Sequence, residues 1–277
     1  MDAIKLISHR GLDLPNLNRR RVDVWLPDEY HTQPERRFPV LYMQDGQNIY
    51  KPKISTGPGW RVVENVRALV AAGKIDPPIV VGITSTMNRM GDYMPQKAMQ
   101  NEAALAYMDA QFRRMPYRMT RGMRGDLYLT WIVEKLKPLI DSTYRSLPEA
   151  EHTAILGSSM GALISLYALC EYPQVFGCAG CMSTHWPIGG DYLIDWFGEH
   201  LPPPGIHKLY FDHGDQGLDE PYAEWQAKMD AAVLAAGYTD GRDFLSFNFP
   251  GEGHAEQYWA GRLQIPLEFF FGIVEGG

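Results

Sequence analysis

One stretch of the chain, residues 153–171, has the pattern of a strand, a tight turn and a helix in direct succession. An apolar strand over 153–157 leads into the motif Gly-Ser-Ser-Met-Gly (157–161), and a helix-forming run follows over 161–171. This is the pattern G-x-S-x-G in the strand–turn–helix context that the motif requires. Glycines flank the serine because side chains there would collide with the neighbouring strand and helix. The pattern therefore predicts an α/β fold in which Ser159 projects above the end of a strand.

Strands and helices also alternate along the rest of the chain. The predicted strands cover 21–26, 38–43, 78–84, 153–157, 175–182, 208–213 and 243–249, and the predicted helices cover 60–72, 127–144, 161–171, 221–236 and 255–271. This alternation predicts a mostly parallel central sheet with helices on both faces, which together with the serine motif indicates an α/β-hydrolase fold. A chain of 277 residues, 45% of them hydrophobic, can form one domain over 1–277.

Charge and hydropathy exclude several classes of partner. The net charge is −7, so the chain has no overall attraction for nucleic acid or for an anionic membrane. No apolar run reaches the length of a membrane span, and the first ten residues lack the pattern of a secretory signal. We therefore expect a cytoplasmic protein with no membrane or nucleic-acid partner.

The three cysteines do not suggest a disulfide framework, because their number is small and odd. Cys178 and Cys181 form a C-x-x-C pair, but the pair lies inside the apolar run 175–182, which is predicted to be a buried strand. A redox pair would instead open a helix after a strand. We expect core cysteines, with a thiol-redox role as a remote alternative.

Ser159 is the candidate nucleophile, because it occupies the central position of the motif. The amide of Met160 lies at the start of the following helix, where it can stabilise a developing oxyanion. Ser158 falls at the first variable position of the motif, so its side chain points elsewhere. The alternative is a tight turn with an incidental serine.

The candidate base is His254, which follows the last predicted strand in the segment Pro-Gly-Glu-Gly-His (250–254). Chains of this fold carry their catalytic groups in the order serine, acid, histidine. His213 ends a strand where the acid is expected, and His207 precedes a strand at the wrong edge of the sheet. The alternative for His254 is a surface histidine.

Three carboxylates compete for the role of acid, since Asp215, Asp219 and Glu220 all lie on the loop after the strand over 208–213. Asp219 is favoured because Asp215 lies close to the strand end, which limits its reach toward the His254 loop. Asp219 could instead cap the helix that begins near residue 221. The sequence leaves this choice open.

Several motifs resemble those of the Putative esterase family. They are Tyr-Met-Gln-Asp-Gly-Gln-Asn (42–48), Gly-Ser-Ser-Met-Gly (157–161) and Gly-Glu-Gly-His (251–254), supported by segments 136–145 and 210–214. That family contains esterase D, the enterochelin esterases, feruloyl and acetyl-xylan esterases, and the antigen 85 mycolyltransferases. The resemblance runs from about Val22 to Phe271, nearly the whole chain.

The resemblance implies that the amide of Gln47 pairs with that of Met160 as an oxyanion hole. It also favours an acid several residues past Gly214, which supports Asp219. Many relatives have Gly-Thr where this chain has Gly214-Asp215, so Asp215 remains the second choice.

Two further features concern the substrate. Trp60, Tyr93, His185 and Trp186 lie near strand ends, where they either line a pocket or pack in the core. The segment at about 101–126 is rich in arginine and methionine, with five arginines, three methionines and no carboxylate over 111–124. We expect a solvated basic loop there, or a lid that closes over an anionic substrate.

The function expected is a serine-dependent carboxylic ester hydrolase acting through an acyl-enzyme on a small-molecule ester. The resemblance leaves open an ester of a sugar, an aromatic acid or a siderophore. No histidine–carboxylate cluster has metal-ligand spacing, and the chemistry needs no cofactor. The alternatives are an acyltransferase that uses the same triad and a non-catalytic binding module on a hydrolase fold.

Overall fold

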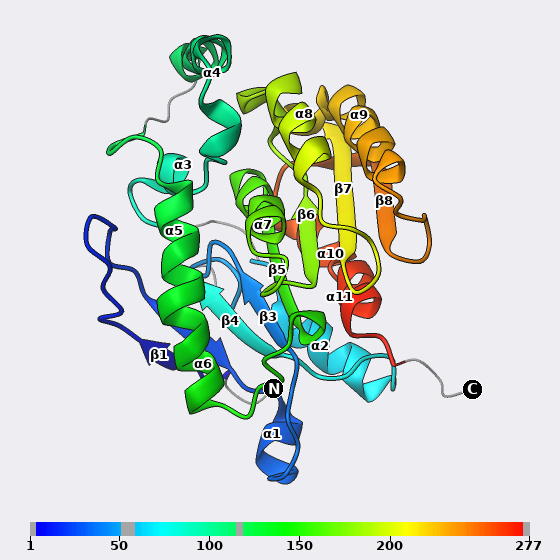
Figure 1. Ribbon diagram of the computed structural model, residues 1–277. Helices are drawn as coiled ribbons and strands as arrows, with labels where there is room; N and C mark the ends of the chain where they lie inside the picture. The colour runs from blue at the N-terminus through cyan, green and yellow to red at the C-terminus, as the bar shows by residue number, and fades with distance from the viewer. Residues whose placement is uncertain (1–3, 51–58, 115–118, 274–277) are drawn as a thin grey trace.

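The fold is described from a computed structural model that covers residues 4–50, 59–114 and 119–273 (Figure 1). Its centre is a sheet of eight strands in the order β1-β2-β4-β3-β5-β6-β7-β8. The strands are β1 (Ile7–His9), β2 (Val22–Trp25), β3 (Val40–Met43), β4 (Ile79–Ile83), β5 (Thr153–Ser158), β6 (Cys178–Met182), β7 (Lys208–Gln216) and β8 (Phe244–Gly253).

The sheet is mostly parallel, as the sequence predicted. All neighbouring pairs from β4 to β8 are parallel, whereas β2 pairs antiparallel with β1 on one side and with β4 on the other. This arrangement is the α/β-hydrolase fold expected from the serine motif. The carboxyl ends of β3, β5, β6, β7 and β8 consequently meet along one edge of the sheet.

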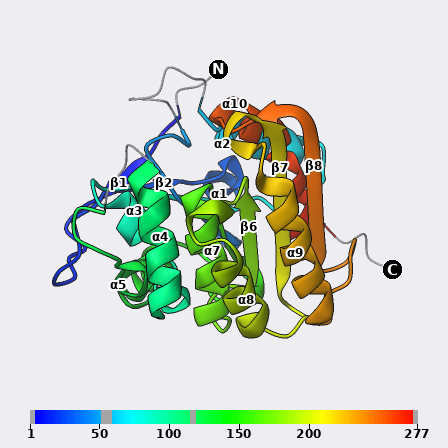
Figure 2. The same cartoon turned by 90° about the horizontal axis from the view of Figure 1, so that it is seen from above.

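Helices cover both faces of the sheet (Figure 2). One face carries α2, α10 and α11, and most of the other helices lie on the opposite face. No helix within the described ranges is both long and apolar enough to cross a membrane. The helices are α1 (Asp28–Thr32), α2 (Val62–Ala71), α3 (Arg89–Asp92), α4 (Glu102–Arg114), α5 (Gly125–Trp131), α6 (Lys137–Thr143), α7 (Met160–Glu171), α8 (Asp191–His200), α9 (Tyr222–Ala235), α10 (Glu256–Arg262) and α11 (Gln264–Phe271).

The central strands are buried on both sides because successive side chains point to opposite faces. In β3, Val40 and Tyr42 pack into one core while Leu41 and Met43 pack into the other. All four residues are at most 1% exposed. This explains why the strand appears in the sequence as a continuous apolar run rather than as an alternating one.

Several element boundaries differ from the sequence prediction. The long helix expected over 127–144 contains a π-helical segment, Ile132–Leu136, between α5 and α6. The helix expected over 255–271 divides at Leu263, and Pro266 lies in the first turn of α11, where its missing N–H has no helical partner to lose. Strand β1 was not predicted, because its three residues are too few to show a period.

Cys178 and Cys181 lie in β6 and are at most 3% exposed. Cys170 lies in α7, and all three thiols are free. Burial raises the pKa of Cys178 to about 12 and that of Cys181 well above its ordinary value. At neutral pH these groups are therefore protonated and weakly nucleophilic.

A buried ion pair ties the segment before β2 to α3. The guanidinium of Arg20 lies 3.0 Å from the carboxylate of Asp92, and both side chains are 1% exposed. Asp92 also accepts hydrogen bonds from Thr86 and Asn88. The Arg20 guanidinium lies 4.4 Å from the centre of the Tyr128 ring, so the pair is enclosed on the helical side as well.

We predict that Arg20→Met destabilises the fold by about 3–5 kcal/mol, because it leaves the Asp92 carboxylate buried without its cation. Denaturant unfolding followed by circular dichroism measures the loss. The neighbouring Arg19 pairs with Asp13, but its side chain is 80% exposed, so Arg19→Met should leave the unfolding midpoint nearly unchanged. Equal losses in the two variants would contradict this account.

Candidate active site

Ser159 forms the turn between β5 and α7. Its backbone has a φ of 58° and a ψ of −123°, a conformation that costs a residue with a side chain about 1–3 kcal/mol. The turn is held by a hydrogen bond of 2.9 Å from the Ser159 amide to the carbonyl of Met182 on β6. A Cβ atom at Gly157 would come within 2.5 Å of the carbonyl oxygen of Gly161. Both the strain and the glycine requirement of the motif are thus present.

His254 and Asp219 are in direct contact. Nδ1 of His254 lies 2.6 Å from Oδ1 of Asp219, whose side chain is fully buried. The other carboxylate oxygen, Oδ2, accepts hydrogen bonds from the Ser183 hydroxyl at 2.6 Å and from the Gly214 amide at 2.9 Å. Burial alone raises the pKa of Asp219, but the hydrogen bonds from His254, Ser183 and Gly214 outweigh it and hold the pKa below its ordinary value. Asp219 is therefore ionised.

The two other carboxylates of this loop lie elsewhere. Asp215 accepts hydrogen bonds of 2.8 Å from the side chain of Gln216 and from the amide of Gly251. Glu220 is exposed. The side chain of His254 therefore contacts Asp219, whereas Asp215 lies beside the loop that carries the histidine.

His185 and Tyr222 connect the Ser159 turn to His254. The amide of His185 donates a hydrogen bond of 3.4 Å to the carbonyl of Ser159, and its Nδ1 lies 2.7 Å from the hydroxyl of Tyr222. The ring of Tyr222 lies 5.9 Å from that of His254, edge to face. Burial, followed by the nearby charges of His254 and Arg89, lowers the pKa of His185 to about 3. The side chain of His185 is therefore a neutral imidazole next to Tyr222 and the Ser159 turn.

The turn after β3 directs the backbone amides of residues 45, 46 and 48 to different acceptors. The amides of Asp45, Gly46 and Asn48 donate to Tyr93, Ile83 and Asp45 respectively. In the part of the chain that the structure describes, the amide of Gln47 has no acceptor. The Met160 amide, the first of α7, has none within the same ranges either, as expected for a helix start.

The Gln47 turn is rigid and packs against the Ser159 turn. The Gln47 side chain and Ser85 exchange two hydrogen bonds of 2.9 and 3.0 Å. Asp45, with a φ of 54°, is held by a two-pronged ion pair of 2.8 Å with Arg89. A Cβ atom on Gly161 would come within 3.4 Å of the Asp45 carboxylate. The two unpaired amides thus belong to adjacent turns.

The four residues considered for substrate contact are all buried. Trp60 packs on Trp259 with ring centres 5.4 Å apart, and the Tyr93 hydroxyl accepts a hydrogen bond from the Asp45 amide. Trp186 donates from its indole nitrogen to Gln226, within the core. Of the four, His185 is the one in contact with the Ser159 backbone.

The basic segment at about 101–126 is largely helical where it is described. Helix α4 buries Met108 and Phe112 and leaves Arg113 and Arg114 exposed at its end. Residues 115–118 lie outside the described ranges. A lid or an anion clamp here remains a prediction.

Sequence reasoning missed the residues that surround Asp219. Ser183, Trp259 and Arg262 come together behind the carboxylate, although 76 to 79 residues separate Ser183 from the other two. The one available signal was the position of Ser183 directly after a strand on the edge that carries Ser159.

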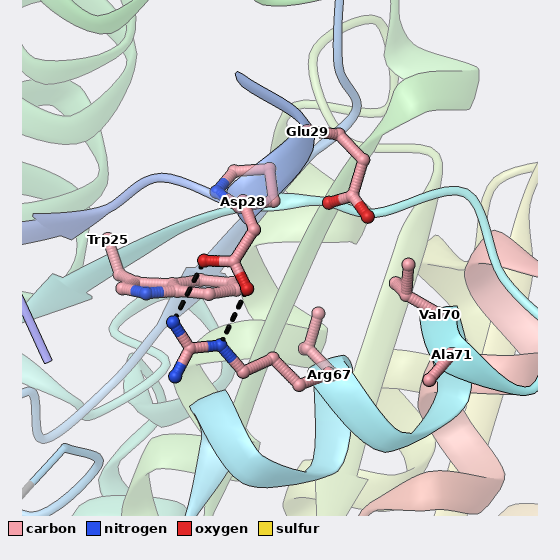
Figure 3. Close-up of a pocket in the computed structure, with 8 residues that line it drawn as sticks. Trp25, Asp28, Glu29, Arg67, Val70 and Ala71 are labelled. Atoms are coloured by element: carbon pink, nitrogen blue, oxygen red, sulfur yellow. Dashed lines mark hydrogen bonds and ion pairs between the residues drawn. The ribbon is translucent and has the colours of Figure 1, made fainter. Parts of the chain in front are cut away.

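A surface hollow of about 330 Å³ is unrelated to this site (Figure 3). It lies between the end of β2 and helix α2, where Arg67 forms a two-pronged ion pair with Asp28 near Trp25. Trp25 pairs with Val80 near the start of β4, at the amino edge of the parallel strands. Ser159 lies at the opposite edge. Among the described residues, no group of three or more His, Cys, Asp or Glu side chains is placed to hold a metal ion.

The strand order and the strained serine turn define the protein as an α/β-hydrolase. The family profile described as Putative esterase matches residues 16–243, which is most of the chain. The chain therefore belongs to the Putative esterase family and is a carboxylic ester hydrolase.

The chain is also similar to individual proteins. The chain is 24% identical over 262 residues to uncharacterized protein YbbA of Bacillus subtilis (strain 168), covering 91% of this chain and 93% of YbbA. Among solved structures, a ferulic acid esterase matches with a TM-score of 0.66 at 19% identity, over 96% of this chain and 98% of that one. The enterobactin esterase FES from Shigella flexneri matches with a TM-score of 0.67 at 18% identity, over 96% of this chain and 58% of FES. At these identities the structural matches show a shared fold.

We predict that His185 makes the fold sensitive to acid. Its pKa of about 3 in the folded protein lies below the value of about 6.5 in the unfolded chain, so its contribution to stability is present above pH 6.5 and is lost as the pH falls toward 3. Between pH 7 and pH 5, the wild type should lose about 2 kcal/mol more unfolding free energy than His185→Gln. Urea unfolding at both pH values measures this difference, and identical pH slopes would refute it.

Proposed function

We propose that the protein hydrolyses small acyl esters by a serine mechanism, with Ser159 as the nucleophile, His254 as the general base and Asp219 as the acid. The observation that carries the proposal is the 2.6 Å contact between His254 and a fully buried Asp219, at the edge of the sheet where Ser159 is held in a strained turn. Serine, acid and histidine follow one another along the chain in the order typical of this fold.

The first step forms an acyl-enzyme. The hydroxyl oxygen of Ser159 bonds to the ester carbonyl carbon while Nε2 of His254 takes up the hydroxyl proton. The carbonyl oxygen becomes an oxyanion, and the unpaired amides of Gln47 and Met160 are the donors that stabilise it. The bond to the alcohol then breaks, and the departing oxygen takes the proton from His254.

The second step releases the acid. His254 removes a proton from a water molecule, whose oxygen attacks the acyl carbon and displaces the Ser159 oxygen, which regains its proton from the histidine. Throughout, the Asp219 carboxylate keeps the Nδ1 proton of His254 in place and so leaves Nε2 free to accept.

The substrate proposed is a small ester of an aromatic acid, a sugar or a siderophore. The support is the family, together with the fold shared with a ferulic acid esterase and an enterobactin esterase. Aromatic rings adjoin the base, since Trp259 lies 5.0 Å and Tyr222 5.9 Å from the His254 ring.

Replacement of the nucleophile tests the proposal most directly. We expect Ser159→Ala to lower kcat for p-nitrophenyl acetate by about 10⁴–10⁶-fold and to abolish labelling by a fluorophosphonate probe. The adjacent Ser158→Ala is the matched control and should retain both labelling and turnover. Turnover of Ser159→Ala near that of the wild type would refute the serine mechanism.

The choice of acid is tested by a pair of isosteric substitutions. Asp219→Asn keeps the shape of the side chain but no longer holds the histidine in the reactive tautomer, so kcat should fall by about 10⁴-fold. Asp215→Asn should change kcat less than about 3-fold, because Asp215 contacts Gln216 and Gly251 rather than the histidine. The reverse ranking would assign the role to Asp215.

A further inference from the structure

Ser183 lies directly after β6 in a strained conformation. Its φ of 44° is in the left-handed region, and its side chain is buried. Two hydrogen bonds from the Ser183 amide hold this conformation, one of 2.8 Å to the carbonyl of Asp212 and one of 3.2 Å to the Asp212 carboxylate. A strained serine buried in a parallel sheet calls for an explanation beyond packing.

The contacts of the Ser183 hydroxyl fix the direction of its proton. Its oxygen accepts hydrogen bonds from the indole N–H of Trp259 at 2.9 Å and from the guanidinium of Arg262 at 3.0 Å. A hydroxyl has two acceptor positions and one proton, and these two donors fill both positions. The proton therefore goes to the remaining neighbour, Oδ2 of Asp219, at 2.6 Å.

Arg262 brings a positive charge to this hydroxyl. The guanidinium is buried and pairs with Asp212 at 2.9 Å and with Glu252 at 2.6 Å. Burial raises the pKa of Asp212, and Arg262 opposes that rise. A hydroxyl that accepts a bond from a cation donates a stronger bond of its own, because hydrogen bonds in a chain polarise one another.

We propose that Ser183 and Arg262 are positioning residues for the acid of the triad. Arg262 polarises the Ser183 hydroxyl, and that hydroxyl orients the Asp219 carboxylate and withdraws negative charge from it. This inference rests on the proposed roles of Asp219 and His254.

The direction in which the acid limb of kcat/KM moves follows from how Ser183 and His254 share the negative charge of Asp219. The more of that charge Ser183 draws off, the less strongly Asp219 stabilises a protonated His254. Loss of the Ser183 hydroxyl or of the Arg262 charge should move the acid limb of kcat/KM upward.

Other groups also face His254 and stay unchanged in these variants. Asp219 contacts it directly, Tyr222 and Trp259 lie against its ring, and neutral His185 lies beyond Tyr222. More distant charges in the neighbourhood are those of Arg89, Asp212 and Glu252. Because Ser183→Ala alters none of these charges, its effect isolates the hydroxyl.

The first experiment compares Ser183→Ala with Ser246→Ala. Ser246 also donates its hydroxyl to a carboxylate, that of Asp230 at 3.0 Å, so Ser246→Ala removes the same kind of bond away from His254. We expect Ser183→Ala to raise the midpoint of the acid limb by about 0.5–1 pH unit and to lower kcat about 10-fold with little change in KM. Ser246→Ala should leave the limb in place. An unmoved limb in Ser183→Ala overturns the inference.

The second experiment tests whether Arg262 acts through Ser183. Arg262→Gln should raise the acid limb in the same direction as Ser183→Ala, and the double variant should shift it by less than the sum of the two. Additive shifts would overturn the action through Ser183. Arg20→Gln, which breaks the other buried arginine–aspartate pair, is the control for lost stability and should not move the limb. If Arg262→Gln does not fold, Arg262→Lys replaces it in the cycle, because an ammonium group cannot donate to Ser183, Asp212 and Glu252 in the planar geometry of the guanidinium.

A measurement without turnover separates this inference from the proposed function. In a Ser159→Ala background, NMR follows the uptake of a proton by His254 with and without Ser183→Ala. If Ser183→Ala raises the pH at which His254 takes up its proton, the inference is supported even if the esterase assays fail. If Ser183→Ala leaves this titration unchanged, the inference is overturned even if the esterase assays succeed. Esterase activity in the wild type that depends on Ser159 bears on the proposed function alone.

Discussion

Asp219 is fully buried, and three hydrogen-bond donors from three separate segments of the chain converge on its carboxylate. A buried carboxylate is costly unless such donors replace its hydration. Because the donors come from the loops after β6 and β8 and from β7 itself, the charge can be buried only when these three strands are in register. The same interaction therefore stabilises an ionised Asp219 and fixes the position of His254 relative to the Ser159 turn.

Backbone strain follows the same edge of the sheet. In the part of the chain that the structure describes, five non-glycine residues have a positive φ, and three of them lie within two residues of the ends of β3, β5 and β6. These three are Asp45, Ser159 and Ser183. Each is held either by hydrogen bonds to a neighbouring strand or by an ion pair. These interactions offset the cost of the strained backbone, about 1–3 kcal/mol per residue. Such strain persists where the positions of amides and hydroxyls matter more than local stability.

The fold and several residues of the candidate site could be predicted from residues close together in sequence. The Ser159 motif, the strand–helix alternation and the glycine-flanked His254 are all local patterns. The carboxylate that contacts His254 could not be identified in this way, because Asp219 and Asp215 share one loop and only the pairing of β7 with β8 decides which of them meets the histidine. Arg262 was missed for the same reason, since its contact with Ser183 exists only after the chain folds and brings α10 to the end of β6. The antiparallel start of the sheet was hidden because β1 has only three residues.

Arg262, Asp212 and Glu252 form a charged cluster next to Ser183, and the balance of its charges argues for a functional origin. One guanidinium faces the carboxylates of Asp212 and Glu252, with the ionised Asp219 one hydroxyl away, so negative charge is in excess in a largely buried region. Buried ion clusters of this kind are often no more stable than well-packed apolar residues of the same volume. Apolar side chains in these positions would stabilise the core as well, but they could not direct the Ser183 proton to Asp219. The arrangement is explained by what it does to the carboxylate rather than by a contribution to stability.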